Sequence, residues 1–305
     1  MNADYTIIVP VFKLEGNKYI KQLFQSISSQ TNKPLEIHIV SGDSRQGRAI
    51  NYGVSVSSTK YIATLDDDSI IDDTELFDKL MRAMEADPTI GIGGASCLIP
   101  QDASPLQKRA MKEIPRRFFP VQEKNVDSDM VQHPCLIMER EFINKIGGED
   151  ESLVRGLDPV LRKKARDAGK RVVIIANTWV YHALPGTVAG IMKMYYRNGR
   201  GSGFALRFYP EKILELSDGY DKGTFVEKRP MPYRIIRRMG YIIGSLLNIK
   251  FIRFLTEVSY TAGVLKEYLL PGYTLKKPDI ADIRKSEMNG YPFKCWLHEV
   301  SLKRQ

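Results

Sequence analysis

Three consecutive aspartates, Asp66, Asp67 and Asp68, follow the apolar run at residues 61–65. Such a run predicts a strand that carries the carboxylates to the carboxyl edge of a sheet, where open α/β folds bind their ligands. Carboxylates at positions i and i+2 lie on one side of an extended chain and suit Mg²⁺ or Mn²⁺ together with substrate phosphates. Because adjacent negative charges repel, a solvated acidic turn is the alternative interpretation. The surrounding elements decide between the two.

Strands and helices are predicted to alternate around this triplet. Apolar runs predict strands at residues 6–9 (stopped by Pro10), 35–40, 61–65 and 90–95. Apolar residues at helical spacing predict helices at residues 17–29, 48–53 and 73–86. This order favours an α/β fold with a mostly parallel sheet and helices on both faces.

The second part of this domain is less regular. Residues 101–130 are polar and show no clear period, which is typical of a long functional or mobile connection. A strand at 135–138, a helix at 159–168 and a strand at 171–175 are predicted beyond it, with Gly169 ending the helix.

The composition is that of a globular protein. The chain has 305 residues, 43% hydrophobic and 27% charged, which allows one large α/β domain with an extension, or two domains. Its three cysteines, Cys97, Cys135 and Cys295, lack disulfide or metal-site spacing and indicate a reducing compartment. No signal peptide and no spanning helix of about 18–20 apolar residues is expected, so we expect a cytoplasmic protein.

The positive charge is concentrated near the end of the chain. Residues 191–305 hold 21 Lys and Arg against 11 Asp and Glu, a balance of +10, whereas residues 1–190 balance at −1. This distribution predicts that the last third of the chain meets an anionic partner, such as lipid headgroups, a phosphorylated substrate or nucleic acid.

Five segments in register resemble the family 2 glycosyltransferases of the GT-A fold: residues 7–12, 48–53, 61–68, 146–148 and 156–158. The resemblance covers about residues 5–205. It implies an inverting transfer of a sugar from a nucleoside-diphosphate sugar to a hydroxyl acceptor. It also implies a catalytic domain at 1–205, with a nucleotide-sugar half at about 1–100 and an acceptor half at about 101–205, followed by a helical, basic amphipathic region at 206–305.

The resemblance assigns roles to the acidic residues. By analogy with the family's Asp-X-Asp motif, Asp68 would hold Mn²⁺ or Mg²⁺, Asp66 would contact the ribose or the metal, and Asp67 is an alternate ligand. A divalent cation would stabilise the charge of the leaving diphosphate. Asp158, in Gly156-Leu157-Asp158, matches the general base that deprotonates the acceptor. Leu157 departs from the family's Glu, and a helix cap before Pro159 is the structural alternative for Asp158.

Other positions complete the predicted site. His182 would join the metal or the diphosphate, with a purely structural role as an equal alternative. On the helix that follows, Lys193, Arg197 and Arg200 would clamp a pyrophosphate, or else form a solvated face.

Nucleotide recognition is expected at the ends of the first two strands. The residues that the resemblance places there are Pro10, Val11, Phe12, Asp43, Arg48 and Asn51. The second strand ends Ser41-Gly42-Asp43 where the family has Asp-Asp-Gly, so its acid is displaced. Asn51 has the alternative of bonding the backbone.

Residues 233–270 predict a basic amphipathic helix. Its apolar face carries residues such as Ile236 and Ile243, and arginines such as Arg237 flank it. This pattern suits an anionic membrane surface, hence peripheral contact with the cytoplasmic membrane face and a sugar or lipid-linked sugar acceptor. Packing on the catalytic domain or on a second copy in a homo-oligomer is the alternative.

Three other functions are weighed. A sugar-phosphate nucleotidyltransferase would need a glycine-rich basic loop after the first strand, and residues 10–16 do not form one. A non-catalytic scaffold is supported by the Leu157 and Ser41 departures alone. Nucleic-acid binding is not expected, because no recognised motif accompanies the charge. The leading prediction is a glycosyltransferase in surface polysaccharide, glycolipid or lipid-linked oligosaccharide assembly.

Overall fold

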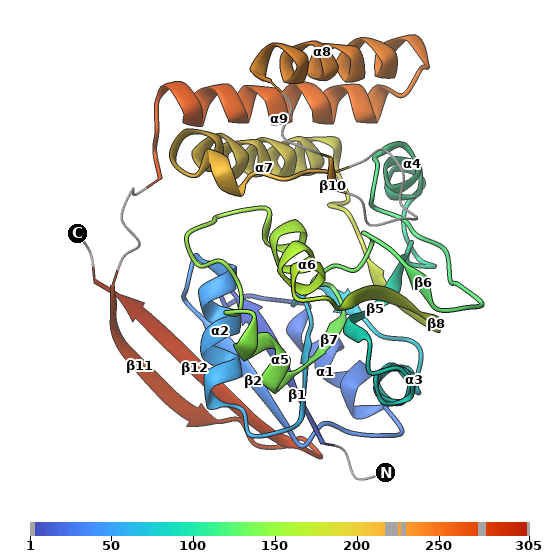
Figure 1. Ribbon diagram of the computed structural model, residues 1–305, viewed down its shortest axis with the longest axis vertical. Coiled ribbons are helices and arrows are strands. Elements are labelled where there is room, and N and C mark those ends of the chain that lie inside the picture. Colours follow the sequence, from blue (N-terminus) through green and yellow to red (C-terminus); the bar gives the residue numbers. More distant parts are fainter. Residues whose placement is uncertain (1–3, 217–224, 227–229, 274–278, 304–305) are drawn as a thin grey trace.

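The computed structural model describes residues 4–216, 225–226, 230–273 and 279–303. A central sheet has helices on both faces, and α7, α8 and α9 are stacked beyond one end of it (Figure 1). The strands are β1 (Tyr5–Val11), β2 (Glu36–Ser41), β3 (Tyr61–Thr64), β4 (Ser69–Ile70), β5 (Ile90–Leu98), β6 (Val126–Asp127), β7 (Leu136–Glu139), β8 (Arg171–His182), β9 (Glu215–Leu216), β10 (Phe225–Val226), β11 (Ile280–Glu287) and β12 (Lys294–Leu302). The helices are α1 (Ile20–Ser28), α2 (Gln46–Val56), α3 (Leu76–Ala86), α4 (Pro105–Glu113), α5 (Arg140–Lys145), α6 (Leu157–Asp167), α7 (Val188–Phe208), α8 (Met231–Leu247) and α9 (Phe251–Leu269), with a 3₁₀ turn at Pro210–Lys212.

The main sheet runs in the order β11-β12-β2-β1-β3-β7-β5-β8-β4. Neighbours from β12 to β3 are parallel, as are β5 and β8, whereas β7 enters antiparallel between β3 and β5. The predicted α/β architecture with a largely parallel central sheet is confirmed. The polar residues that follow β1, β2 and β3 lie together at the carboxyl edge of this sheet.

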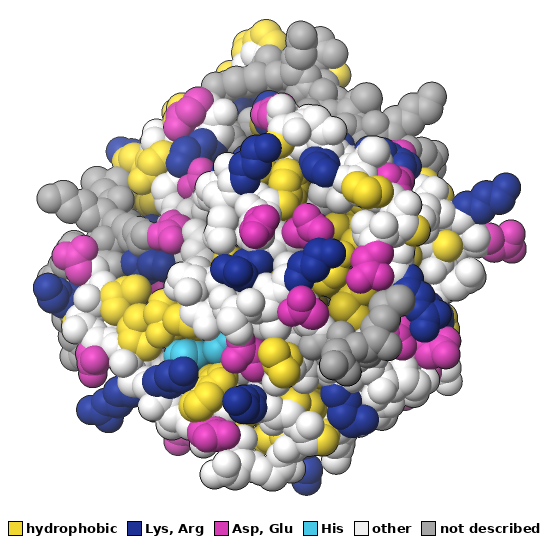
Figure 2. Space-filling model, turned by 60° about the horizontal axis from the view of Figure 1, so that its bottom comes forward, with side chains coloured by type: hydrophobic (Ala, Val, Ile, Leu, Met, Phe, Trp, Pro, Cys, Tyr) yellow, Lys and Arg dark blue, Asp and Glu magenta, His cyan; other side chains and the backbone are white. Residues whose placement is uncertain are grey.

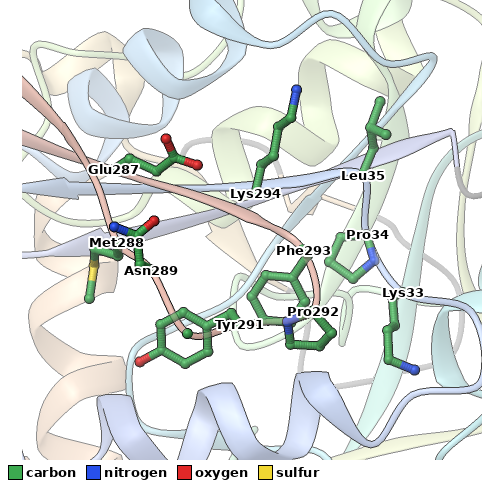
Figure 3. A pocket seen from close by; sticks show the side chains of 11 residues that line it. Lys33, Pro34, Leu35, Glu287, Met288, Asn289, Tyr291, Pro292, Phe293 and Lys294 are labelled. Carbon is green, nitrogen blue, oxygen red and sulfur yellow. The ribbon is translucent and has the colours of Figure 1, made fainter.

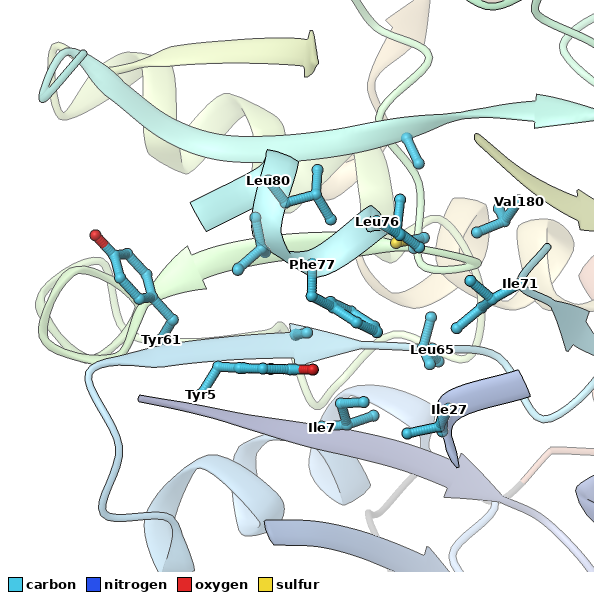
Figure 4. Close-up of a cluster of buried hydrophobic side chains, with 14 of the residues drawn as sticks. Tyr5, Ile7, Ile27, Tyr61, Leu65, Ile71, Leu76, Phe77, Leu80 and Val180 are labelled. Atoms are coloured by element: carbon cyan, nitrogen blue, oxygen red, sulfur yellow. The ribbon is translucent and has the colours of Figure 1, made fainter. Parts of the chain in front are cut away.

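Alternating residues of the buried strands fill two cores. On one face Ile7 and Val9 pack with α1 and α3, where the Tyr5 and Phe77 rings stack at 4.9 Å (Figure 4). On the other face Ile8 packs with residues of α2, α5 and α6. A strand buried on both faces explains why β1 reads as a continuous apolar run.

Pro10 does not stop the first strand. The strand continues to Val11, with Pro10 opposite Val40. Leu65 N donates to Ile8 O, so the backbone polar groups of Ile8 point toward β3, and those of Pro10, two residues on, lie on the same side. The pairing of β3 with β1 ends opposite Ile8, before Pro10 is reached. No ladder donor is therefore required of Pro10, and proline is tolerated there.

Two further elements differ from the predictions. The polar segment 101–130 contains α4, whose start has a capping box: Gln107 N donates to Ser104 Oγ, and Ser104 N donates to Gln107 Oε1. Residues 206–305 were expected to be helical, but within them β11 and β12 form a hairpin that joins the sheet beside β2. The expected domain limit at residue 205 falls inside α7.

The predicted basic amphipathic segment forms two helices, α8 and α9. Helix α9 packs closely on α7, because Gly263 and Gly199 let the two backbones approach. A Cβ on Gly263 would lie 2.1 Å from Tyr196 O, and one on Gly199 would lie 2.0 Å from Tyr260 O. Among the described residues, no helix combines the length and apolar content needed to cross a membrane.

Candidate active site

The aspartate triplet lies between β3 and β4, and the pairing of β4 with β8 brings His182 to it. Ser69, directly after Asp68, is opposite His182 in the antiparallel register. Residues more than a hundred positions apart therefore meet at the carboxyl edge of the sheet, which is the usual ligand edge of such folds.

Asp66, Asp68 and His182 form a candidate metal site. One ligand atom from each residue lies within 4.8 Å of the others, and the Nε2 of His182 is 3.1 Å from the Oδ1 of Asp68. All three side chains are half-buried. Two carboxylates and one imidazole fit a divalent cation that accepts a nitrogen ligand beside oxygens and keeps open positions for substrate.

The charges in this cluster are strongly coupled. Burial raises the pKa of Asp66 to about 6, and the neighbouring Asp68 carboxylate acts in the same direction. Burial also acts on Asp68, but its bond to His182 outweighs burial and lowers the Asp68 pKa below its ordinary value. The pKa of His182 is raised well above its ordinary value because Asp68 outweighs the burial of the ring. A cation would relieve the repulsion between the two carboxylates.

Asp67 is turned away from this cluster. Its Oδ2 accepts a hydrogen bond from Asn17 Nδ2, whereas Asp66 Oδ1 accepts one from Gln46 Nε2 at 3.0 Å. The triplet is not extended as predicted: it forms a turn in which Ser69 N donates to Asp66 O at 3.1 Å, and this turn brings Asp66 and Asp68, but not Asp67, to His182.

Asp158 lies in the first turn of α6. The helix begins at Leu157 after Gly156, whose φ of 88° is the left-handed conformation that glycine favours. The capping interpretation of Asp158 is therefore wrong, since Gly156 holds that position. Instead Asp158 Oδ1 accepts hydrogen bonds from the backbone N of His133 at 2.9 Å and from its Nδ1, which lies 2.6 Å away.

Asp158 interacts electrostatically with the candidate metal cluster, because its negative charge helps to raise the pKa of Asp66. Burial alone would raise the pKa of Asp158, but the charge and hydrogen bonds of His133 lower it far below its ordinary value. Asp158 is thus a carboxylate at any neutral pH, which is the state that a proton acceptor requires.

The ends of the first two strands carry the residues predicted to bind the nucleotide. Phe12 is 71% exposed, beyond the buried Val11, while Pro10 is half-buried. Asp43 and Arg48 are both buried and form an ion pair, with Arg48 Nη2 donating to Asp43 Oδ1 at 2.8 Å. Nucleotide binding by Asp43 or Arg48 stays a prediction.

Asn51 bonds the backbone of the loop before α6. Its Oδ1 accepts from Glu149 N at 2.8 Å, and its Nδ2 donates to Glu149 O at 3.1 Å. The alternative of backbone bonding is what the structure shows for this side chain. A role in nucleotide binding stays a prediction.

A cleft of about 750 Å³ adjoins the candidate metal cluster. Asp68 and His182 line it together with basic side chains, namely Arg117, Lys193, Arg197 and Arg200. Lys193 and Arg197 are exposed on one face of α7. Arg200 also bonds the buried Glu267, with Nε and Nη2 each 2.8 Å from Oε2. A surface of this charge suits a diphosphate.

A second hollow, of about 730 Å³, lies at the turn between β11 and β12 (Figure 3). Lys294, on its wall, is opposite Glu36, the first residue of the parallel strand β2. This hollow is therefore at the amino end of the strands, away from the aspartate triplet. Of the two hollows, the one with candidate metal ligands and convergent basic groups is the candidate active site.

Four residues of the site lie outside the sequence-based set. His133 contacts Asp158, Glu149 contacts the other side of His133, Arg117 lines the cleft, and Gln46 bonds Asp66. Arg117 and His133 belong to stretches without periodicity, so no pattern pointed to them. Glu149 adjoins the Gly147-Gly148 pair within the family-like stretch, and that adjacency was its only signal.

The comparisons with known proteins concern the family resemblance and the fold. Residues 43–147 match the model of the family described as Glycosyl transferase family 2. A solved structure, the mannosyltransferase PcManGT from Pyrobaculum calidifontis in complex with GDP-Man and Mn²⁺, is similar with a TM-score of 0.53 and 15% identity over 88% of each chain. No curated protein sequence matches the chain. The resemblance is confirmed to this extent: residues 43–147 match the glycosyl transferase family 2 model, and the chain has the mixed α/β fold of its GT-A neighbour.

Proposed function

We propose that this protein transfers a sugar from a nucleoside-diphosphate sugar to a hydroxyl acceptor with inversion at the anomeric carbon. The observation that carries the proposal is the meeting of Asp66, Asp68 and His182 beside a basic cleft. The family match over residues 43–147 supports the reaction class. The structural neighbour, which holds GDP-Man and Mn²⁺, makes a guanosine diphosphate donor the first to examine.

Asp66, Asp68 and His182 would hold the cation. When bound, Mn²⁺ or Mg²⁺ would neutralise charge that develops on the leaving diphosphate. The imidazole favours Mn²⁺, since Mg²⁺ prefers oxygen ligands alone. Arg117, Lys193 and Arg197 would add positive charge around the phosphates.

Asp158 is the proposed general base. It is ionised, and its carboxylate remains 32% exposed, so an acceptor hydroxyl can approach it. Replacement of Asp158 by Asn should lower turnover by at least about 10²-fold, because proton transfer by a positioned base contributes factors of that size. Nucleotide affinity should change little. The measurement is release of nucleoside diphosphate from GDP-mannose and from UDP-glucose with Mn²⁺, and full activity of the variant would remove the base assignment.

The acceptor is proposed to be a sugar or lipid-linked sugar, with the protein on the cytoplasmic face of a membrane. Helix α8 supports this placement, because its exposed apolar residues include Ile235, Ile236, Ile243 and Leu247, the last two 51% and 76% exposed. Basic residues flank them in the sequence. Figure 2 turns the end of the molecule away from α8 toward the viewer, and there acidic and basic side chains are interspersed. An apolar face with basic flanks suits anionic lipid.

A further inference from the structure

His133 is a buried histidine held between two carboxylates. Its Nδ1 lies 2.6 Å from Asp158 Oδ1, and its Nε2 lies 2.9 Å from Glu149 Oε1. The side chains of His133 and Glu149 are 4% and 0% exposed, whereas that of Asp158 is 32% exposed. The three groups therefore run from a sealed carboxylate, through an imidazole, to a carboxylate that solvent reaches.

The two oxygens of Asp158 have different surroundings. Oδ1 accepts two hydrogen bonds from His133, one from its backbone N and one from its ring. Among the described residues, no hydrogen bond reaches Oδ2, and this oxygen is not among the buried atoms that lack a partner. One oxygen is thus fixed by His133, and the other is left accessible with its lone pairs free.

Glu149 is fixed in turn from the other side. Asn51 bonds both the N and the O of Glu149, and Gly148, with a φ of 59°, leaves room for the Asn51 amide. Glu149 Oε2 is buried without a hydrogen-bond partner. A sealed carboxylate with an unpartnered oxygen is costly unless a positive charge lies beside it. Among the described residues, the basic side chain in ion-pair contact with Glu149 is His133, which carries such a charge when protonated.

Both carboxylates favour the doubly protonated ring. Burial alone would lower the pKa of His133, but Asp158 and Glu149 together raise it well above the ordinary value. With both nitrogens protonated, Nδ1 donates to Asp158 and Nε2 donates to Glu149, so both ring contacts are satisfied.

We propose that His133, backed by Glu149, is a positioning residue that keeps Asp158 ionised and aims its Oδ2 at the acceptor hydroxyl. The inference rests on the proposed glycosyl transfer. In that step the acceptor O–H bond breaks, and its proton passes to Asp158 Oδ2. A bond forms between the acceptor oxygen and the anomeric carbon, and the bond from that carbon to the diphosphate breaks, with its electron pair leaving on the diphosphate. His133 keeps its two protons throughout.

The protonation of His133 can be measured without any substrate. The chain has four histidines, so the full-length protein labelled with ¹⁵N-histidine gives few ring signals, and the His133→Asn variant assigns the one in question. We expect the His133 ring to stay doubly protonated at pH 7.5 in the wild type and to lose a proton at lower pH in Glu149→Gln. A wild-type ring that titrates at or below pH 6.5 would overturn the proposal.

Turnover then tests the link to Asp158. The variant His133→Asn keeps a hydrogen-bond donor to Asp158 but loses the positive charge of the ring. We therefore expect kcat for GDP-mannose or UDP-glucose turnover with Mn²⁺ to fall by about 10²-fold. With KM for the donor little changed, the pKa of the Asp158 carboxyl should rise toward its ordinary value, which the ¹³C signals of labelled aspartate carboxyl groups report without substrate. An Asp158 pKa as low in His133→Asn as in the wild type would contradict a positioning role, whatever the fall in kcat.

A matched control separates these effects from general damage. His298→Asn makes the same substitution at a buried histidine beside β2, remote from Asp158, and should leave kcat at pH 7.5 and the pKa of Asp158 unchanged. If the wild type turns over no nucleotide sugar, the proposed function fails, and the ring titration still decides whether His133 is held as a cation. If His133→Asn does not fold, Glu149→Gln supplies both measurements.

Discussion

Asp68 and His182 illustrate how single residues at this site constrain each other. Their bond lowers the pKa of Asp68 and raises that of His182, while burial raises the pKa of Asp66. A metal that binds here must displace a proton from His182, and its positive charge then replaces the charge of that proton beside Asp68. Metal binding at this cluster should therefore weaken as the pH falls.

Replacement of Asp68 by Ala should weaken Mn²⁺ binding by more than about tenfold, because one of two carboxylate ligands is lost. Free Mn²⁺ measured by electron paramagnetic resonance during titration reports the affinity directly. Asp67→Ala is the matched control, since Asp67 bonds Asn17 and stands outside the cluster. Equal losses in both variants would place the metal elsewhere.

The sequence alone predicted some residues of this candidate site, whereas others could be found only in the structure. The triplet and His182 were predictable because each follows an apolar strand, and parallel strand ends share an edge. The partners of Asp158 were not, because His133 comes from an aperiodic stretch and meets Asp158 only through the tertiary fold.

At the scale of elements, the crossing of α7 and α9 depends on glycine. Gly263→Ala should destabilise the protein by about 1–3 kcal/mol, because the new methyl group would lie 2.1 Å from the backbone oxygen of Tyr196. Gly240→Ala on α8 meets no atom within 4 Å and should instead stabilise by up to about 1 kcal/mol. Denaturant unfolding compares the two, and a Gly263 variant as stable as the wild type would refute the close crossing.

The strand β12 should make stability depend on pH. His298 Nε2 lies 2.9 Å from His38 Nδ1, and Tyr52 Oη is 3.3 Å from His298 Nδ1. Burial lowers the pKa of His298 to about 4, and the charges of His38 and Lys285 act in the same direction, against Glu36. Burial likewise lowers the pKa of His38.

Between the ordinary histidine pKa of about 6.5 and about 4, the unfolded chain binds protons that the folded chain does not. The free energy of unfolding should therefore decrease as the pH falls through this range, by as much as about 3 kcal/mol for His298. Thermal melts of wild type and His298→Asn from pH 7 to pH 4.5 check this. Parallel pH dependence in the two proteins would show that His298 does not contribute.

Element prediction succeeded where periodicity was strong and failed where tertiary context decides. The alternation up to residue 98 is visible because buried strands and amphipathic helices differ in period. Helix α4 was missed although Ser104, Pro105 and Gln107 form a recognisable helix start. Strand β11 was not predicted because its residues are largely exposed and charged, and they show no alternation of apolar and polar side chains.

At the scale of the whole molecule, the edge with the candidate active site and the proposed membrane face are linked through α7. Its Lys193 and Arg197 line the cleft, while its glycines receive α9, on which α8 packs. The helical layer thus connects the candidate active site with the apolar surface of α8 (Figure 1). A lipid-linked acceptor would approach the site from this side of the molecule.

The protein should sediment with vesicles of phosphatidylcholine containing anionic phosphatidylglycerol, and added salt should weaken this association. The double variant Ile236→Glu and Leu247→Glu should reduce the bound fraction severalfold, because charge replaces the most exposed apolar groups of α8. Leu35→Glu, at the opposite end and 52% exposed, is the control. Unchanged binding in the α8 variant would favour a protein partner for this face.

The most direct test of the central claim is calorimetric titration of the protein with GDP, UDP, CDP and dTDP, each with and without Mn²⁺. If Asp66, Asp68 and His182 hold a cation that bridges a nucleoside diphosphate, one nucleotide should bind well with Mn²⁺ and at least about tenfold more weakly without it. Binding that is equal with and without Mn²⁺, or no binding by the folded protein, would contradict a metal-dependent glycosyltransferase site at this edge of the sheet.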